Sequence, residues 1–373
     1  MANAQTHILL TAMTLLFGLL LSVVVFMLVY LILDRRKKLR HTGWKKIAEQ
    51  IIMTAIFHEE HNPPIYPQDK VPNHPKRAAL TPIPIPDEAA PLIQNPQFRD
   101  LLTEEILAAN KDLAGAAAGN LRLLYNQLNL DTESQEKLGS LKWHIKARGI
   151  QELAAMHRKD RVGRIYKNTN NRNEFIRMEA QLAIVHLYGH EGLRFLDVVS
   201  EPITEWQQIK LLSQLPAGTD DDLAGMSRWL HSPNHSVIAF ALKLTGTHRR
   251  FDLHNTVVAC LRHPDPQIRI LALRCLGQIA NETTAQYIIR EYSLNDNHYR
   301  TAALEVLAAI AGPDEIPFLE TCLDEENHNL KLLAARILAR LGTTGQKVLD
   351  GYPKAGEHPY NEIFQQAKSE VAA

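Results

Sequence analysis

A stretch that occurs twice decides the fold: it reads DPQIRILALRCLGQI from Asp265 to Ile279 and DNHYRTAALEVLAAI from Asp296 to Ile310, 31 residues later. In both copies an acidic residue stands first, a cation follows four places later, and apolar residues recur at helical spacing. A fixed period of this size indicates a small helical unit stacked many times, so that the stack forms the core and no single unit does.

The same template continues along the chain in both directions. Further copies begin at Asn327, Asn234 and Asn173. Counted from the cation, apolar residues stand at −1, +3, +7 and +10, and the +3 residue is usually alanine, so one stripe of a helix is apolar. The Asp or Asn before each run is a typical N-cap residue. A shorter apolar stretch lies between consecutive copies, which predicts a helix–turn–helix pair in each repeat.

One copy departs from the pattern. In the register of Gln207, the cap position holds Ile203 and the alanine position holds Lys210, so we expect a degenerate repeat there. The recurrent cations invite a binding interpretation, but the repeat favours a structural ladder in which each cation bonds the Asp or Asn of its own or the next repeat. The ladder residues are Asn173, Arg177, Asp265, Arg269, Asp296, Arg300, Asn327 and Lys331.

The period, the Asp or Asn cap and the alanine-rich second helix resemble the HEAT family, in the short variety named after the phycocyanobilin-lyase repeats. The resemblance covers about residues 137–349. It implies an all-α fold, a right-handed α-solenoid of about six HEAT-like helical hairpins of 30–31 residues. A solenoid of this kind is typical of proteins that bind other proteins and seldom catalyse.

The N-terminal end of the chain has a different character. Residues 8–33 contain no charged residue and exceed the ~20 apolar residues that a membrane-spanning helix needs. No Lys or Arg precedes this run, whereas a basic cluster begins at Arg35, so the positive-inside rule puts the N-terminus outside and the rest of the chain in the cytoplasm. We therefore expect a single-pass anchor in the inner membrane. A cleaved signal peptide fits poorly, because no basic region precedes the run.

A basic amphipathic helix is predicted directly after the anchor. An apolar stripe recurs there at helical spacing, and lysines stand on the opposite face. Such a helix can lie in the plane of the lipid headgroups, dock on a partner subunit, or pack on the solenoid of its own chain. The predicted membrane-interface residues are Arg35, Arg36, Lys37, Lys38, Trp44, Ile47 and Ile51.

The predicted organisation has six segments. They are an anchor (1–34), the amphipathic helix (35–61), a linker (62–96), a helical cap (97–136), the solenoid (137–350) and a polar tail (351–373). The linker is predicted because its ten prolines leave no room for a regular helix. The cap is expected to cover the first apolar face of the solenoid, and the tail to fray or pack loosely.

Composition and motifs argue against several classes of function. The 41 Lys and Arg balance the 41 Asp and Glu, which disfavours non-specific binding to nucleic acid. The cysteines Cys260, Cys275 and Cys322 all stand at apolar helical positions, as in proteins of a reducing cytoplasm. Neither the HEEH sequence of residues 58–61 nor His190–Glu191 has the equivalent placement that iron-binding HEAT hydroxylases use. We therefore expect no metal, no cofactor and no catalytic residue.

The remaining candidate site is a row of charged residues five places after the cation position of each repeat, which Ile238 occupies in the copy at Asn234. Equivalent positions of a solenoid line one continuous surface, which suits an extended protein partner, and an ordinary solvated helix face is the alternative. The row consists of Lys243, Arg274, Glu305 and Arg336, with Arg340 one turn further.

The sequence favours a non-catalytic, membrane-tethered scaffold or adaptor whose cytoplasmic solenoid binds a protein as a subunit of a larger membrane complex. Tethering raises the effective concentration of the solenoid near membrane partners. By architectural analogy, the complex would be a cell-envelope glycosyltransferase or a secretion machine. The alternative from another class is an enzyme of the bilin-lyase or iron-hydroxylase kind, which predicts bound chromophore or iron. Neither a nucleic acid nor a small-molecule substrate is expected.

Overall fold

The computed structural model describes residues 2–58, 82–215 and 225–372. The described residues form helices and turns without a strand, as the sequence predicts. The chain divides into two compact units, unit 1 (residues 1–159) and unit 2 (residues 160–373). In the described part of the chain, no helix combines the length and the apolar character that crossing a membrane requires.

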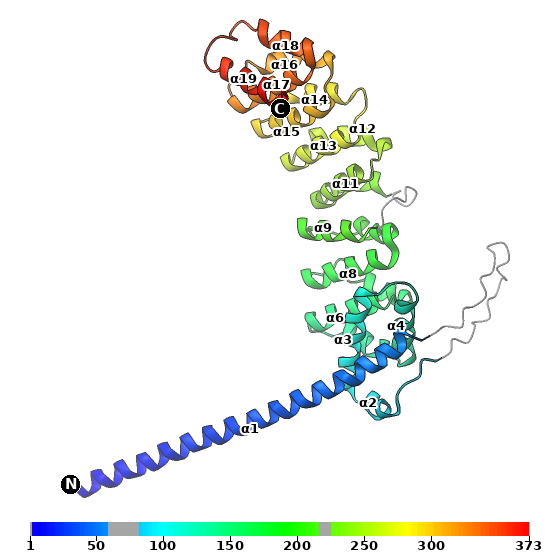
Figure 1. Cartoon of the computed structure of the whole chain (residues 1–373), viewed down its shortest axis with the longest axis vertical. Coiled ribbons are helices and arrows are strands. Elements are labelled where there is room, and N and C mark those ends of the chain that lie inside the picture. Colours follow the sequence, from blue (N-terminus) through cyan, green and yellow to red (C-terminus); the bar gives the residue numbers. More distant parts are fainter. Residues whose placement is uncertain (1, 59–81, 216–224, 373) are drawn as a thin grey trace, which may run out of the picture. The chain divides into compact units, whose positions relative to one another are not determined.

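Unit 1 is built on one long N-terminal helix. This helix, α1 (Ala2–Ile56), covers both the apolar run and the amphipathic stripe without a break (Figure 1). The other elements are η1 (Asp87–Ala89), α2 (Ala90–Ile93), α3 (Pro96–Asp112), α4 (Gly115–Gln127), α5 (Asp131–Gly139) and α6 (Trp143–Ala155). The short helix η2 (Lys159–Arg161) lies at the boundary between the units.

The amphipathic stripe of α1 packs on the chain's own helices. Ile51 is fully buried and belongs to the same core cluster as Phe98 of α3 and Leu124 of α4. The indole ring of Trp44 meets the ring of Phe98 edge to face, with 6.0 Å between centroids. The stripe therefore packs within its own chain, but on helices of the predicted cap and not on the solenoid, as the third predicted role had it. The contact is with α3 and α4, because these helices leave an apolar face that the stripe matches.

The predicted linker is shorter than residues 62–96 at its C-terminal end. Residues 62–81 lie outside the described part of the chain, but the residues after them are folded into unit 1. Ile83 is buried, and both its backbone N–H and its carbonyl bond the Gln127 amide at 2.9 Å. The helix α2 forms despite the prolines because Pro91 stands in its first turn, where a missing N–H costs nothing.

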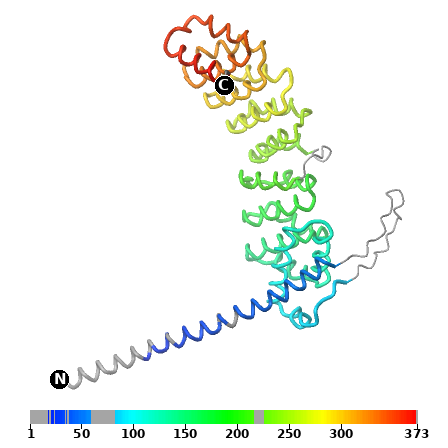
Figure 2. The backbone as a smooth tube through the Cα atoms, viewed as in Figure 1, coloured from blue at the N-terminus to red at the C-terminus, as the bar shows by residue number. Residues whose placement is uncertain are grey.

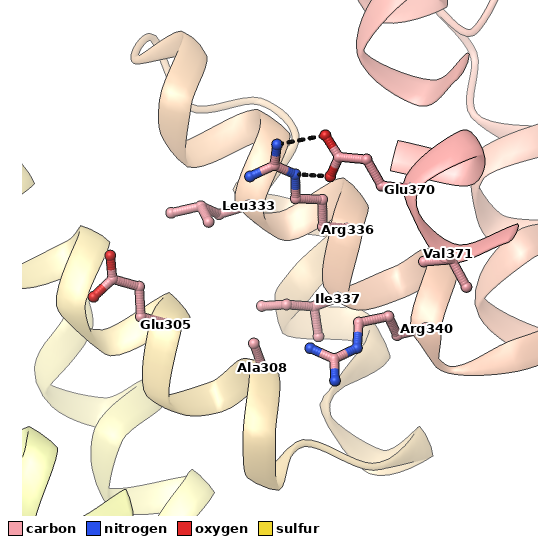
Figure 3. Close-up of a pocket in the computed structure, with 8 residues that line it drawn as sticks. All are labelled: Glu305, Ala308, Leu333, Arg336, Ile337, Arg340, Glu370 and Val371. Carbon is pink, nitrogen blue, oxygen red and sulfur yellow. Dashed lines mark hydrogen bonds and ion pairs between the residues drawn. The ribbon is translucent and has the colours of Figure 1, made fainter. Parts of the chain in front are cut away.

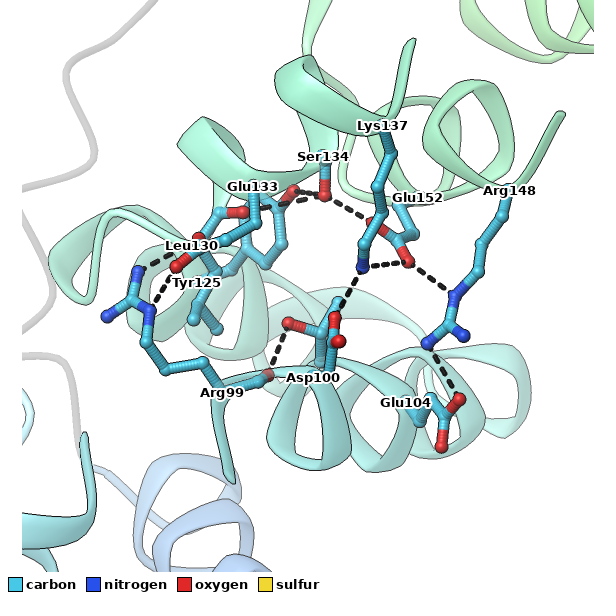
Figure 4. Close-up of polar contacts among 11 residues, drawn as sticks. Arg99, Asp100, Glu104, Tyr125, Leu130, Glu133, Ser134, Lys137, Arg148 and Glu152 are labelled. Carbon is cyan, nitrogen blue, oxygen red and sulfur yellow. Dashed lines mark hydrogen bonds and ion pairs between the residues drawn. The ribbon is translucent and has the colours of Figure 1, made fainter. Parts of the chain in front are cut away.

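A polar cluster ties α3, α5 and α6 together (Figure 4). Glu152 of α6 is completely buried, and its carboxylate accepts bonds from Ser134, Lys137 and Arg148. Lys137 also pairs with Asp100 of α3 at 2.8 Å. A buried carboxylate is tolerated only when cations and donors compensate for lost hydration, so this cluster fixes how the three helices meet.

Unit 2 is a stack of helical pairs, as the period predicts (Figure 2). The longer, second helices of the pairs are α8 (Glu174–Tyr188), α9 (Glu205–Gln214), α11 (His235–Thr247), α13 (Pro266–Gln278), α15 (Asn297–Ile310) and α17 (His328–Arg340). The shorter, first helices are α7 (Val162–Tyr166), η3 (Gly189–Asp197), α10 (Met226–Trp229), α12 (His254–Ala259), α14 (Thr284–Tyr292) and α16 (Ile316–Cys322). The connecting turns contain η4 (Phe251–Leu253), η5 (Cys260–Arg262) and η6 (Pro313–Glu315). A final pair consists of α18 (Gly342–Gly351) and α19 (Tyr360–Ala372).

The repeat at α9 is capped one residue later than the register of Gln207 places it. Thr204 accepts the backbone N–H of Gln207, whose side chain bonds the Thr204 N–H in return, so a capping box starts the helix. The cap position is therefore Thr204 and not Ile203, and the alanine position is Leu211 and not Lys210. The expectation of a degenerate cap was wrong, because the one spacing of 30 residues lies between Thr204 and Asn234, whereas Asn173 and Thr204 are 31 residues apart.

The C-terminal tail does not fray as predicted. Helix α19 buries an apolar stripe on α17, and Tyr352 in the preceding turn joins the same core. The stripe consists of Tyr360, Ile363, Phe364 and Ala367. These residues stand at helical spacing, and they cover the apolar face that the last repeat would otherwise expose to water.

Replacing Gly149 of α6 by alanine should destabilise unit 1. A Cβ atom there would lie 2.5 Å from the backbone nitrogen of Leu138 and 2.7 Å from the carbonyl oxygen of Ser134, both in α5. Backbone atoms cannot move aside without separating the helices, so we expect a loss of about 1–3 kcal/mol in the free energy of unfolding. Denaturant unfolding of the full-length chain, followed by circular dichroism, measures this loss.

The matched control is Gly139→Ala, in the same helical hairpin. No atom lies within 4 Å of the added Cβ, and alanine has the higher helix propensity, so we expect unchanged or slightly higher stability. Equal stabilities of the two variants would contradict the close approach of α5 and α6.

Candidate functional site

The charged row lies on equivalent turns of four consecutive second helices. Lys243 is on α11, Arg274 on α13, Glu305 on α15, and both Arg336 and Arg340 on α17. Arg274, Glu305 and Arg340 are exposed, whereas Lys243 and Arg336 are half-buried. Four of these residues share a register in stacked repeats, and Arg340 stands one turn after Arg336, so all five belong to one face of unit 2.

Three residues of the row meet at a groove of about 580 Å³ between α15, α17 and α19 (Figure 3). Its charged lining consists of Glu305, Arg336 and Arg340 of the row together with Glu370 of α19. The apolar lining consists of Ala308, Leu333, Ile337 and Val371. The other two residues of the row lie outside the groove: Lys243 bonds the Gln208 amide oxygen at 2.8 Å, and Arg274 is exposed on α13.

An ion pair closes one side of the groove. The Arg336 guanidinium donates a hydrogen bond to one carboxylate oxygen of Glu370 at 2.7 Å, and its Nε lies 2.6 Å from the other oxygen in an ion pair (Figure 3). These bonds hold the pKa of Glu370 below its ordinary value. Sequence reasoning missed Glu370 because it assigned residues 351–373 to a loose tail. The helical spacing of the apolar residues from Tyr360 to Ala367 is the signal that could have found it.

Arg340 is the free cation of the groove. It is exposed, and within the described residues no carboxylate pairs with it. The same holds for Arg274 on α13. The arrangement therefore offers two unpaired guanidinium groups along one face and an apolar floor between charged edges. Such a surface can bind a polypeptide segment that carries both apolar side chains and carboxylates.

The predicted ladder is structural, but its partners differ from the prediction. The Asp and Asn residues accept backbone N–H groups of their own helices, as with Asn173 and Ile176, so they are occupied as N-caps. The cations instead reach back to the turn before the helix. Arg177 donates to the Asn171 carbonyl at 2.7 Å, and Arg269 donates to the corresponding carbonyl of His263 at 2.9 Å.

The later cations of the ladder use additional partners. Arg300 bonds the Ser293 carbonyl at 3.1 Å and the Glu325 carboxylate at 3.1 Å. Lys331 lies over the Tyr360 ring, 4.7 Å from its centroid. In α9, Gln208 takes the cation position and its amide donates to the Ile203 carbonyl at 3.1 Å. In α8, α9, α13 and α15 the side chain at this position therefore satisfies a carbonyl of the turn before its helix, whereas α11 carries Ile238 there, which has no donor.

The predicted membrane-interface residues are placed differently from one another. Arg35 and Lys38 are exposed on α1, whereas the side chains of Arg36 and Lys37 lie outside the described part. Trp44 and Ile47 are half-buried against unit 1, and Ile51 is completely buried there. Ile51 therefore cannot contact lipid, because α3 and α4 cover it.

Residues with reactive or ligating side chains are packed in the core. Cys260, Cys275 and Cys322 are buried and free, and burial raises the thiol pKa to about 11 for Cys260 and about 12 for the other two. Little thiolate therefore exists near neutral pH. His190 is buried in η3 with its ring 5.1 Å from that of His248. Residues 59–61 of the HEEH sequence lie outside the described part of the chain.

Part of unit 2 matches a known family of repeats. Residues 254–346 match the family model of HEAT repeats. No curated protein matches the chain.

Two solved structures share 14% sequence identity with the chain. An engineered protein matches with a TM-score of 0.37, over 74% of this chain and 85% of that one. The complex of CpcE and CpcF of phycocyanin lyase from Nostoc sp. matches with a TM-score of 0.24, over 81% of this chain and 99% of that one.

Replacing Arg177 by methionine tests whether the ladder is structural. Arg177 is only 6% exposed, and its removal leaves the Asn171 carbonyl without its donor, so we expect a loss of about 1.5–3 kcal/mol in the free energy of unfolding. Arg172→Met is the control, because Arg172 is exposed in the same turn. A thermal unfolding midpoint that falls equally in both variants would contradict the structural role.

Proposed function

We propose that this HEAT-repeat protein is a non-catalytic scaffold, tethered to a membrane by residues 8–33, whose unit 2 binds a protein partner along the charged row. The observation that carries the proposal is the groove between α15, α17 and α19, where Glu305, Arg336 and Arg340 surround an apolar floor. HEAT repeats generally mediate protein–protein interaction, because stacked helices present one continuous surface to an extended partner.

The chemistry of the row indicates what the partner must carry. Arg274 and Arg340 are exposed and unpaired among the described residues, so each one adds a favourable contact when a carboxylate approaches. Leu333 and Ile337 give the same segment an apolar contact in the groove. An extended or helical segment with carboxylates spaced between apolar residues satisfies both requirements.

The membrane tether is supported by the apolar run and by its surroundings on α1. Every described side chain between residues 21 and 33 is exposed, including Phe26 and Tyr30. Apolar side chains on all sides of one helix favour an apolar environment. Lys and Arg are enriched at the cytoplasmic ends of membrane-spanning helices, and such residues follow the apolar run from Arg35 onward. Both units would therefore lie in the cytoplasm.

The continuity of α1 then sets where unit 1 stands. Trp44, which packs on α3, is the eleventh residue after Leu33, the end of the apolar run. At 1.5 Å per residue, unit 1 would begin about 16 Å from the end of the run. A scaffold held this close to the bilayer is suited to a partner in the same membrane, as a subunit of a larger complex.

Affinity purification of the full-length protein from gently solubilised membranes tests the proposal. We expect one membrane protein to co-purify in stoichiometric amount, identified by mass spectrometry. The triple variant Lys243→Glu, Arg274→Glu and Arg336→Glu should reduce its recovery at least tenfold, because it reverses three cations on the proposed surface.

The matched control reverses three exposed cations on other helices: Arg164→Glu, Arg194→Glu and Lys347→Glu, on α7, η3 and α18. Its net charge changes by the same amount, so recovery of the partner should stay within twofold of the wild type. Equal recovery with both triple variants would overturn the assignment of the row. Purification of the chain alone, with bound iron or visible absorbance, would overturn the scaffold function in favour of an enzyme.

A further inference from the structure

Two neighbouring helices of unit 2 begin with the same pair of residues, an acidic one followed by an aromatic one. The first two residues after the N-cap are Glu174 and Phe175 in α8, and Glu205 and Trp206 in α9. The other second helices carry different pairs at these positions: His235–Ser236, Pro266–Gln267, Asn297–His298 and His328–Asn329. The stack therefore forms without an aromatic residue at this place.

Both aromatic side chains are open to solvent. Phe175 is 52% exposed and Trp206 is 60% exposed, and one turn further along α9 Ile209 is 57% exposed. Exposed Trp side chains are costly in water, and Trp is among the residues most enriched at the energetic centres of protein interfaces. Helices α8 and α9 lie side by side in the stack (Figure 1), so equivalent positions on them share a face.

The one-residue shift of the α9 cap is the reason that Trp206 is exposed. If Ile203 were the N-cap, Trp206 would stand directly before the cation position, where the residue is buried in the other repeats, as with Val237. Because Thr204 is the N-cap, Gln207 stands at that buried position, and Trp206 stands one residue earlier and faces solvent. The exposed indole is thus built by a specific cap and not by a loose helix end.

The charges around these side chains select the partner. Glu174 and Glu205 are exposed, and no cation pairs with either carboxylate in the described part of the chain. The Trp206 ring already has one cation over it, the Lys210 ammonium at 4.8 Å from the centroid, which illustrates the affinity of its face for positive charge. Anionic lipid headgroups and nucleic-acid phosphates would be repelled by the two carboxylates.

We propose that Glu174, Phe175, Glu205, Trp206 and Ile209, together called the acidic–aromatic patch, dock a basic amphipathic helix of a partner protein. Apolar side chains of that helix would cover the aromatic rings, and its Lys or Arg residues would meet the carboxylates. Membrane proteins carry such segments beside the cytoplasmic ends of their spans. The inference rests on the proposed function in so far as it requires a protein partner in the same membrane.

Site-specific photocrosslinking in cells tests the patch with the full-length protein. A photoreactive phenylalanine analogue replaces Trp206, and in a second protein it replaces Gln267, the exposed residue at the equivalent position of α13. We expect an adduct at position 206 whose partner peptide, sequenced by mass spectrometry, is apolar and rich in Lys or Arg. The yield at position 267 should be at least tenfold lower.

Charge reversal tests the role of the carboxylates. Glu174→Lys with Glu205→Lys, added to the protein with the analogue at 206, should lower the adduct yield at least fivefold. Glu282→Lys with Glu326→Lys changes the net charge equally at two other exposed sites and should leave the yield within twofold. A yield that survives reversal of the patch carboxylates would overturn the charge complementarity.

The remaining outcomes separate this inference from the proposed function. An adduct with lipid, with a second copy of this chain or with an acidic segment would overturn the inference. So would the absence of any adduct at 206 while a stoichiometric partner still co-purifies. The absence of every co-purifying protein would instead refute the scaffold function on which the inference rests.

Discussion

The close approach of neighbouring second helices at a buried alanine is the constraint on which unit 2 depends. The alanines at this position have no exposed surface, and a larger side chain there would hold the helices apart. They are Ala180, Ala241, Ala272, Ala303 and Ala334. In α9 the position holds Leu211, which is also buried. Each helix can cover its apolar stripe only between two neighbours, so the stability of one repeat depends on the next.

This constraint occupies only part of each helix and leaves the rest free to vary. The stripe faces the neighbours, the cap satisfies the first N–H groups, and the following cation or glutamine satisfies carbonyls of the preceding turn. The positions five places after the cation position and directly after the N-cap have none of these three roles. Most residues of both candidate surfaces stand at these positions, and Arg340 and Ile209 are the exceptions. Their composition is therefore available for recognition without cost to the stack.

The sequence predicted the structural features that recur in every repeat, but it misplaced the helix at the point where the repeat length changes. The helical pairs, the N-caps and the buried cysteines follow from periodicity, because the same local chemistry recurs in each copy. Helix α9 was misplaced by one residue, since a fixed period cannot show that Thr204 and not Ile203 caps it. The ladder cations were assigned to the wrong acceptors, because sequence spacing does not reveal which way a long side chain bends.

The packing of segments outside the repeat was harder to predict, because the residues that they contact are distant in sequence. The stripe around Ile51 matches lipid, a foreign helix or α3 equally well on its own, and only the apolar face of α3 and α4 decides among them. The folding of Ile83 depends on the Gln127 amide, 44 residues away. Glu370 could be found only by noticing a helical stripe in a segment that its overall polarity makes look like a tail.

The ion pair at the C-terminal end of the stack also indicates in which direction a bound partner segment extends along the charged row. The Arg336 guanidinium is paired with Glu370 of α19, so on the C-terminal side the row ends in an ion pair. Of the cations in the row, Arg340 and Arg274 have no carboxylate partner among the described residues, and they lie on α17 and α13. A partner segment in the groove thus gains more by extending toward α13 than by crossing α19. Since α8 and α9 lie further along the same stack, a partner that follows this direction approaches the repeats that carry the acidic–aromatic patch.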